Sequence, residues 1–127
     1  MITSLVLSIL VLCNPVQTKE PQVLVKNFPL EGIYTVTGTQ KSIKYNGVCV
    51  IRQLQADSYH FVNVAGNVTT QGVGIKTGDN FAVSWTDGKL HGISTYRITG
   101  RTLNGRWTND GILSRETLTY LGDLPED

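Results

Sequence analysis

The sequence predicts an all-β protein that folds as an eight-stranded antiparallel up-and-down β-barrel. Three observations predict this class. No helical period of any length follows Gly32, β-rich runs alternate with turn residues about every ten to twelve positions, and several runs place apolar side chains at alternate positions. A two-sheet β-sandwich is the alternative, because it is built from the same kind of short strands.

The expected strands are short segments rich in β-branched and aromatic residues. In chain order they are Ile33–Thr39, Tyr45–Leu54, Ser58–Val64, Gln71–Thr77, Phe81–Thr86, Gly92–Thr99, Leu103–Thr108 and Ser114–Leu121. Several of the breaks carry Gly or Asx-Gly pairs, which accept the positive φ of hairpin turns at little steric cost; Asp87-Gly88 and Asp110-Gly111 are the clearest. Connections this short join only antiparallel neighbours, so an up-and-down order follows.

Alternation within the strands predicts which side chains point inward. Three runs show it most clearly: Phe81, Val83 and Trp85; Leu103, Gly105 and Trp107; and Glu116, Leu118 and Tyr120. Eight consecutive strands with one apolar face close naturally into a barrel, which also removes exposed edges. A barrel of this size is either filled by its side chains or holds one small ligand.

The first residues indicate an export signal. Ile2–Leu12 is an apolar run too short for the about 20 residues of a membrane-spanning helix, so we expect no stable membrane span. We assign residues 1–18 to a signal peptide, 19–31 to a linker, 32–121 to the barrel and 122–127 to an acidic tail. The protein is then secreted or periplasmic; a lipid anchor on Cys13 is the alternative. Removal of the signal leaves Cys49 alone, which favours a small buried hydrophobic residue over a reactive thiol.

The composition excludes several function classes. The chain has 127 residues, which predicts a single domain, and a net charge of +1, which gives no electrostatic reason to expect nucleic-acid binding. Two histidines and two cysteines are too few for the usual structural zinc site, so no metal and no cofactor is expected.

Short motifs in a fixed order run through the body of the chain. They are Gly32-Ile33-Tyr34, Tyr45-Asn46-Gly47-Val48-Cys49-Val50-Ile51, Gly72-Val73-Gly74-Ile75, Val83-Ser84-Trp85, Tyr96-Arg97-Ile98, Leu103-Asn104-Gly105-Arg106-Trp107 and Glu116-Thr117-Leu118. In this order the chain resembles a group of small exported bacterial proteins, mostly uncharacterised, some of which are labelled fibronectin-binding. The Gly-x-aromatic opening is also similar to the first strand of avidins and lipocalins, which implies a calycin-like barrel.

Six residues form the candidate ligand-binding set: Tyr34, Trp85, Tyr96, Arg97, Trp107 and Glu116. The large rings either line a pocket or fill the barrel. If Glu116 points inward, its carboxylate must be paired or protonated, and Arg97 is one candidate partner. A salt bridge or a tyrosine hydrogen bond at one barrel end is the structural alternative to a ligand contact.

No set of side chains indicates catalysis, since His60 and His91 lie in separate segments and no inward pair of carboxylates is evident. The sequence therefore favours an exported, non-catalytic protein that binds an extracellular or envelope protein, for which the resemblance suggests fibronectin. One alternative is a carrier that holds a small apolar ligand in the barrel mouth near Trp85 and Trp107. Another is an enzyme of unfamiliar type that uses Glu116.

Overall fold

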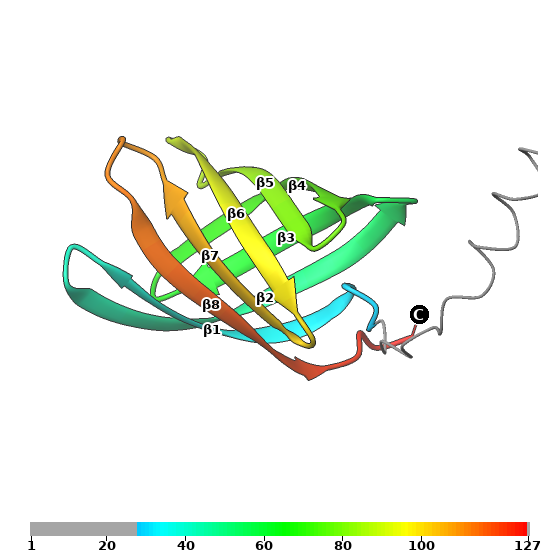
Figure 1. The fold of residues 1–127 in the computed structure, drawn as a ribbon. Coiled ribbons are helices and arrows are strands. Elements are labelled where there is room, and N and C mark those ends of the chain that lie inside the picture. The colour runs from blue at the N-terminus through cyan, green and yellow to red at the C-terminus, as the bar shows by residue number, and fades with distance from the viewer. Residues whose placement is uncertain (1–27, 127) are drawn as a thin grey trace, which may run out of the picture.

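The computed structural model describes residues 28–126, and these form a closed barrel of eight antiparallel strands (Figure 1). The strands are β1 (Gly32–Gln40), β2 (Ile43–Gln55), β3 (Ser58–Ala65), β4 (Val68–Thr77), β5 (Asn80–Thr86), β6 (His91–Thr99), β7 (Thr102–Thr108) and β8 (Ser114–Gly122). Each strand pairs with the next, and β8 pairs back onto β1. The predicted up-and-down barrel is confirmed. The two-sheet sandwich is excluded, because the β1–β8 pair leaves no open edge.

The strand connections alternate between the two ends of the barrel. One end carries the β1–β2, β3–β4, β5–β6 and β7–β8 connections. The opposite end carries the other three connections, and both the segment that enters β1 and the segment that leaves β8 lie there (Figure 1). We call the first the open end and the second the closed end, for reasons that follow from their packing.

Two hairpins at the open end are tighter than the sequence predicts. The β3–β4 turn contains only Gly66 and Asn67, so β4 begins at Val68 and not at Gln71. The β1–β2 turn contains only Lys41 and Ser42, both with positive φ, 48° and 68°. Positive φ at both central residues is the geometry of a type I′ turn, which normally contains Asn or Gly. Lys-Ser is not a recognisable sequence for this turn, so the sequence predicts a longer break between the two strands.

The core fills the half of the barrel nearest the closed end. Inward side chains alternate with outward ones along every strand, as predicted for the runs ending at Trp85 and Tyr120. Rings from three strands, Phe61, Phe81 and Tyr96, pack against one another with centroids 6.1–6.5 Å apart. The free energy of folding that this burial supplies therefore comes mainly from one half of the barrel.

The closed end is sealed by the chain that precedes β1. Leu30 is only 5% exposed, and its carbonyl accepts a 2.6 Å hydrogen bond from the hydroxyl of Tyr34. The guanidinium of Arg101 lies 4.2 Å from the ring centroids of both Phe28 and Tyr120. The last residues of the predicted linker, 28–31, are therefore part of the packed domain. The predicted signal peptide and Cys13 lie outside the described residues.

Candidate functional site

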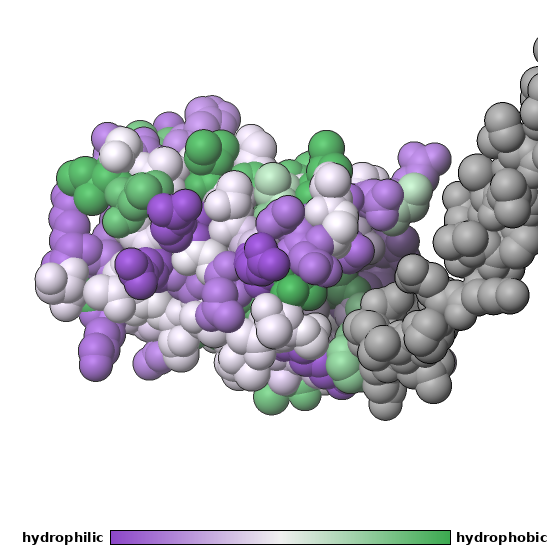
Figure 2. All heavy atoms as spheres, in the orientation of Figure 1, coloured by the Kyte–Doolittle hydropathy of each residue, from purple (hydrophilic) through white to green (hydrophobic). Residues whose placement is uncertain are grey.

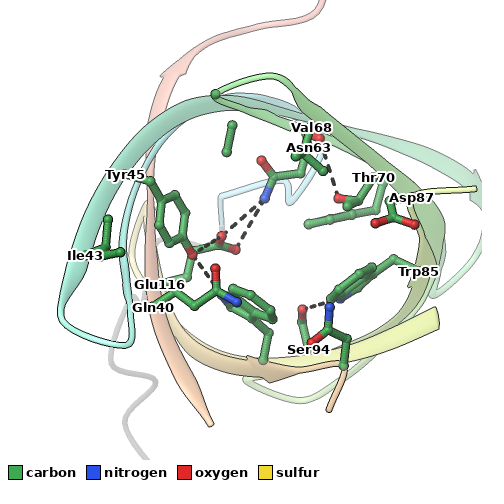
Figure 3. Close-up of a pocket in the computed structure, with 15 residues that line it drawn as sticks. Gln40, Ile43, Tyr45, Asn63, Val68, Thr70, Trp85, Asp87, Ser94 and Glu116 are labelled. Atoms are coloured by element: carbon green, nitrogen blue, oxygen red, sulfur yellow. Dashed lines mark hydrogen bonds between the residues drawn. The ribbon is translucent and has the colours of Figure 1, made fainter. Parts of the chain in front are cut away.

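The barrel is hollow at its open end. A cavity of about 330 Å³ opens there, within the roughly 300–1,000 Å³ of small-molecule sites. Figure 3 shows side chains from several strands pointing into it. The lining residues are the rings Tyr45, Phe61, Trp85 and Trp107; the polar residues Gln40, Asn63, Thr70, Ser94 and Asn109; the carboxyls Asp87 and Glu116; and Ile43, Ala65, Gly66 and Val68.

Glu116 lies at the inner end of this cavity. It is an inward residue of β8 and only 6% exposed, and the next inward residue, Leu118, already belongs to the packed core. The carboxylate accepts hydrogen bonds from the hydroxyls of Tyr96, at 2.5 Å, and Tyr45, at 2.9 Å. The Nδ2 atom of Asn63 donates to both carboxylate oxygens, at 3.3 and 3.4 Å (Figure 3). All three partners are neutral.

Both tryptophans donate hydrogen bonds to hydroxyl groups in the cavity wall. Trp107 Nε1 donates to the hydroxyl of Tyr45 at 2.7 Å, and Tyr45 donates on to Glu116. Trp85 Nε1 donates to Ser94 Oγ at 2.8 Å. An indole N–H can only donate, so Trp107 leaves the hydroxyl proton of Tyr45 directed toward the carboxyl. The chain of hydrogen bonds from Trp107 through Tyr45 therefore favours the ionised form of Glu116.

Burial and hydrogen bonding act on Glu116 in opposite directions. Burial raises the pKa of the carboxyl above its ordinary value, while the bonds from Tyr96, Tyr45 and Asn63 lower it, and the rise is the larger effect. The pKa values of Tyr96 and Tyr45 are raised first by burial and then by the Glu116 charge. Both phenols therefore stay neutral and remain available as donors.

Asn63 has an unused acceptor beside the carboxylate. Its side chain is 7% exposed and lines the cavity, and its Oδ1 atom has no hydrogen-bond partner among the described residues. A buried amide oxygen without a partner costs about 1–3 kcal/mol, so such atoms are rare in folded proteins. The position of this oxygen, in the cavity wall and next to Glu116, marks it as a candidate acceptor for a ligand or for water.

The mouth of the cavity is bordered by aliphatic side chains. Every hairpin at the open end exposes at least one: Ile43, Val68, Leu90, Ile112 and Leu113. Figure 2 shows hydrophobic side chains at the end of the molecule that carries the β1–β2 and β7–β8 connections. We call these five exposed side chains the aliphatic rim; polar residues of the cavity wall, Gln40, Asp87 and Asn109, lie at the same end.

The structure brings four of the six predicted site residues together. Trp85, Trp107 and Glu116 line the cavity, the two indoles in edge-to-face contact with centroids 5.8 Å apart, and Tyr96 bonds to Glu116 from behind the wall. Tyr34 does not belong to the site, because it lies at the closed end and bonds to Leu30.

The predicted partnership of Arg97 with Glu116 is wrong. Arg97 follows the inward residue Tyr96, so alternation turns its side chain to the outer surface, where it is exposed. A pocket on that surface is lined by Arg97 and also by Glu116, but no ion pair joins the two side chains. The partners of Glu116 are a tyrosine on β2, an asparagine on β3 and a tyrosine on β6. Glu116 therefore forms hydrogen bonds with tyrosine hydroxyls, as the structural alternative predicts, and not a salt bridge with Arg97.

The six residues chosen from the sequence do not include three that line the cavity near Glu116: Tyr45, Asn63 and Ser94. Tyr45 and Asn63 could have been found by extending the inward alternation of their strands, since Tyr45 shares parity with Cys49 and Asn63 with Phe61. Ser94 could have been found in the same way, since it shares parity with the inward residue Tyr96.

No group of three or more His, Cys, Asp or Glu side chains is placed to hold a metal ion in residues 28–126. Within the same residues there is no apolar helix of membrane-spanning length.

Comparison of the chain with models of known protein families finds no match, and comparison with curated proteins finds none at a significant level. The resemblance to small exported bacterial proteins therefore stays a prediction.

Proposed function

We propose that the protein is a binding protein that holds a small organic molecule in the cavity at the open end of the barrel. The observation that carries the proposal is the cavity itself, which is already formed and has a buried carboxylate and an unpaired amide oxygen in its wall. A barrel shaped only for stability would fill this volume, because empty space inside a core costs free energy of folding.

The composition of the wall also supports a small-molecule ligand. Four aromatic rings supply apolar surface, and a few fixed polar atoms at the inner end supply orientation. Small-molecule sites typically combine these two features. The export predicted from residues 1–18 would place such a carrier outside the cytoplasm.

Binding of an extracellular or envelope protein, such as fibronectin, is the second candidate. The aliphatic rim favours it, because exposed apolar side chains gathered at one end of a molecule are typical of contact surfaces. The rim serves the first proposal equally well, as the border that an apolar ligand crosses. The cavity distinguishes the two candidates, since protein binding at a rim does not require a hollow interior.

Intrinsic fluorescence tests the proposal directly. The chain contains two tryptophans, and both line the cavity. We expect saturable changes in tryptophan fluorescence when the full chain is titrated with small aromatic amines, alcohols and acids, for at least one of these classes. No saturable change with any class would contradict the proposal.

Two neighbouring threonines provide matched variants. Thr70 lines the cavity, whereas Thr69 is exposed on the outer face of the same strand. Thr70→Phe places a ring in the cavity and is expected to weaken binding by about tenfold or more, while Thr69→Phe leaves the affinity within about twofold. Equal effects of the two substitutions would place the ligand outside the cavity.

A further inference from the structure

The wall of the cavity carries negative charge and no positive charge. Of its charged side chains, Glu116 lies at the inner end and Asp87 at the mouth, and no Lys, Arg or His is among the described residues that line it. Glu116 accepts hydrogen bonds from three neutral groups, but no cation pairs with it among the residues that the structure describes. Buried carboxylates are normally paired with a cation, because three neutral donors replace only part of the lost hydration.

Asn63 presents, at the inner end of the cavity, a second polar group without a full set of partners. Its Nδ2 atom already donates to Glu116, while its Oδ1 atom is a buried acceptor without a donor. The inner end of the cavity therefore presents two groups that each lack a partner. Among the described residues, the carboxylate of Glu116 has no paired cation, and the amide oxygen of Asn63 has no hydrogen-bond donor. A group with a positive charge and at least two N–H donors satisfies both atoms at once.

The rings above this position also suit a cation. Trp85, Trp107 and Tyr45 line the cavity around the carboxylate, and the two indoles are held by their Nε1 hydrogen bonds. The faces of indole and phenol rings attract positive charge, and their hydrocarbon area binds the apolar body of a ligand. An anionic ligand would instead bring a second negative charge to Glu116, which costs free energy in a water-poor site.

We propose that the ligand is a compact organic cation, a primary or secondary amine with an apolar body, whose ammonium group bonds to Glu116 and to Asn63 Oδ1. This inference rests on the proposed function and specifies its ligand class. An alkyl ammonium keeps its proton at neutral pH, as lysine does, so no proton has to be taken up on binding. The volume of about 330 Å³ limits the ligand to the small end of the usual range.

Three probes of matched shape test the charge preference. The full chain is titrated at neutral pH with 2-phenylethylamine, 2-phenylethanol and phenylacetate, and binding is followed by tryptophan fluorescence and calorimetry. The amine is expected to bind about tenfold or more tightly than the alcohol, and phenylacetate more weakly than either. Alcohol or acid binding as tightly as the amine would overturn the inference and leave the proposed function standing. No binding of any probe would count against both.

Two carboxyl variants show which carboxylate is responsible for the preference for the amine. Glu116→Gln is expected to weaken amine binding by about tenfold or more and to change alcohol binding by no more than about twofold. Asp87→Asn is the matched control: it removes a carboxylate from the mouth, while the new amide oxygen can still accept the turn hydrogen bonds from Lys89 and Leu90. Equal losses of amine affinity in both variants would contradict a role specific to Glu116.

The wild-type protein provides a test that does not depend on the folding of a variant. Amine affinity is expected to fall as the pH is lowered through the raised pKa of Glu116, while alcohol affinity stays constant. Inside the barrel, the other titratable groups near this carboxyl are the phenols of Tyr45 and Tyr96 and the thiol of Cys49; burial raises the pKa of each, so they stay neutral in this range. On the outer side, Arg97, Arg106 and Arg115 line a second pocket that Glu116 also lines. The pKa of Asp87 at the mouth is lowered by its backbone hydrogen bonds. Amine affinity that is independent of pH across this range would overturn the inference.

Discussion

Glu116 is the one charged side chain that is buried among residues 28–126, and its neighbours determine its properties. Burial alone would favour the protonated form. The hydroxyls of Tyr96 and Tyr45 oppose that effect by donating to the carboxylate, and Trp107 in turn donates to Tyr45. The protonation state of this carboxyl is therefore linked to Trp107 through Tyr45.

The raised pKa of Glu116 makes the stability of the protein depend on pH in a defined direction. The folded state holds the Glu116 proton more strongly than the unfolded chain, so this contribution is complete below the unfolded pKa of about 4.5. It is lost as the pH rises through the higher folded pKa. The free energy of unfolding of wild type, relative to Glu116→Gln, is therefore expected to decrease as the pH rises through this interval.

Urea denaturation of the two proteins at a series of pH values measures this difference. All other titratable groups are common to both proteins, so to first order their contributions cancel. A difference that stays flat, or that grows as the pH rises, would show that the environment of Glu116 does not disfavour its charge.

At this scale the sequence predicted that Glu116 points inward, because alternation along β8 places it on the face of Leu118. It did not predict the partners. Tyr45 and Asn63 lie 71 and 53 residues away along the chain, and only the closed ring of strands brings them to the carboxyl. The choice of Arg97 failed because a neighbour in sequence on a strand points to the opposite face.

At the scale of the strand, glycines determine where the aromatic rings lie. Three rings lie over a glycine directly opposite on the neighbouring strand: Tyr45 over Gly38, Trp85 over Gly92, and Tyr96 over Gly105. A Cβ at any of these glycines would overlap the ring. The missing side chains let the rings lie along the barrel wall, which keeps the centre of the open end clear.

Gly92→Ala tests this arrangement. The added methyl overlaps the Trp85 indole, so the ring must move away from the wall, and its bond to Ser94 is strained or lost. We expect the free energy of unfolding to fall by about 1–3 kcal/mol, together with a shift in the tryptophan emission. Denaturant titration and emission spectra measure the two effects.

Gly122→Ala is the matched control for that substitution. A Cβ at Gly122 has no atom within 4 Å, so the change is expected to alter stability by less than about 0.5 kcal/mol. If Gly92→Ala were as well tolerated as Gly122→Ala, the indole would not be held against the wall by the absent side chain.

At the scale of the whole molecule, the two ends of the barrel differ in how closely they are packed. The closed end joins the segment before β1, the β6–β7 turn and β8 through Arg101, whose guanidinium lies between the rings of Phe28 and Tyr120. The open end carries the cavity and the aliphatic rim. The closely packed contacts and the proposed binding cavity therefore lie at opposite ends of the barrel axis.

Arg101→Met tests this separation. Loss of the two cation–π contacts is expected to lower the free energy of unfolding by about 1 kcal/mol, measured by denaturant titration. The affinity for a cavity ligand should not change, because the cavity lies at the other end. Arg52→Met, at an exposed position of β2, is the control and should have almost no effect on stability. A loss of affinity in Arg101→Met would show that the two ends are coupled.

The sequence by itself determined the all-β class, the number and order of the strands, and the inward faces of the runs that contain Trp85, Trp107 and Glu116. These are local properties, because alternation and turn composition act within one strand or one hairpin. Only the tertiary structure decided that the open half is hollow and that Tyr45, Asn63, Tyr96 and Glu116 meet there. Barrel closure and strand register set those distances, and both depend on pairing between segments that are far apart in the chain.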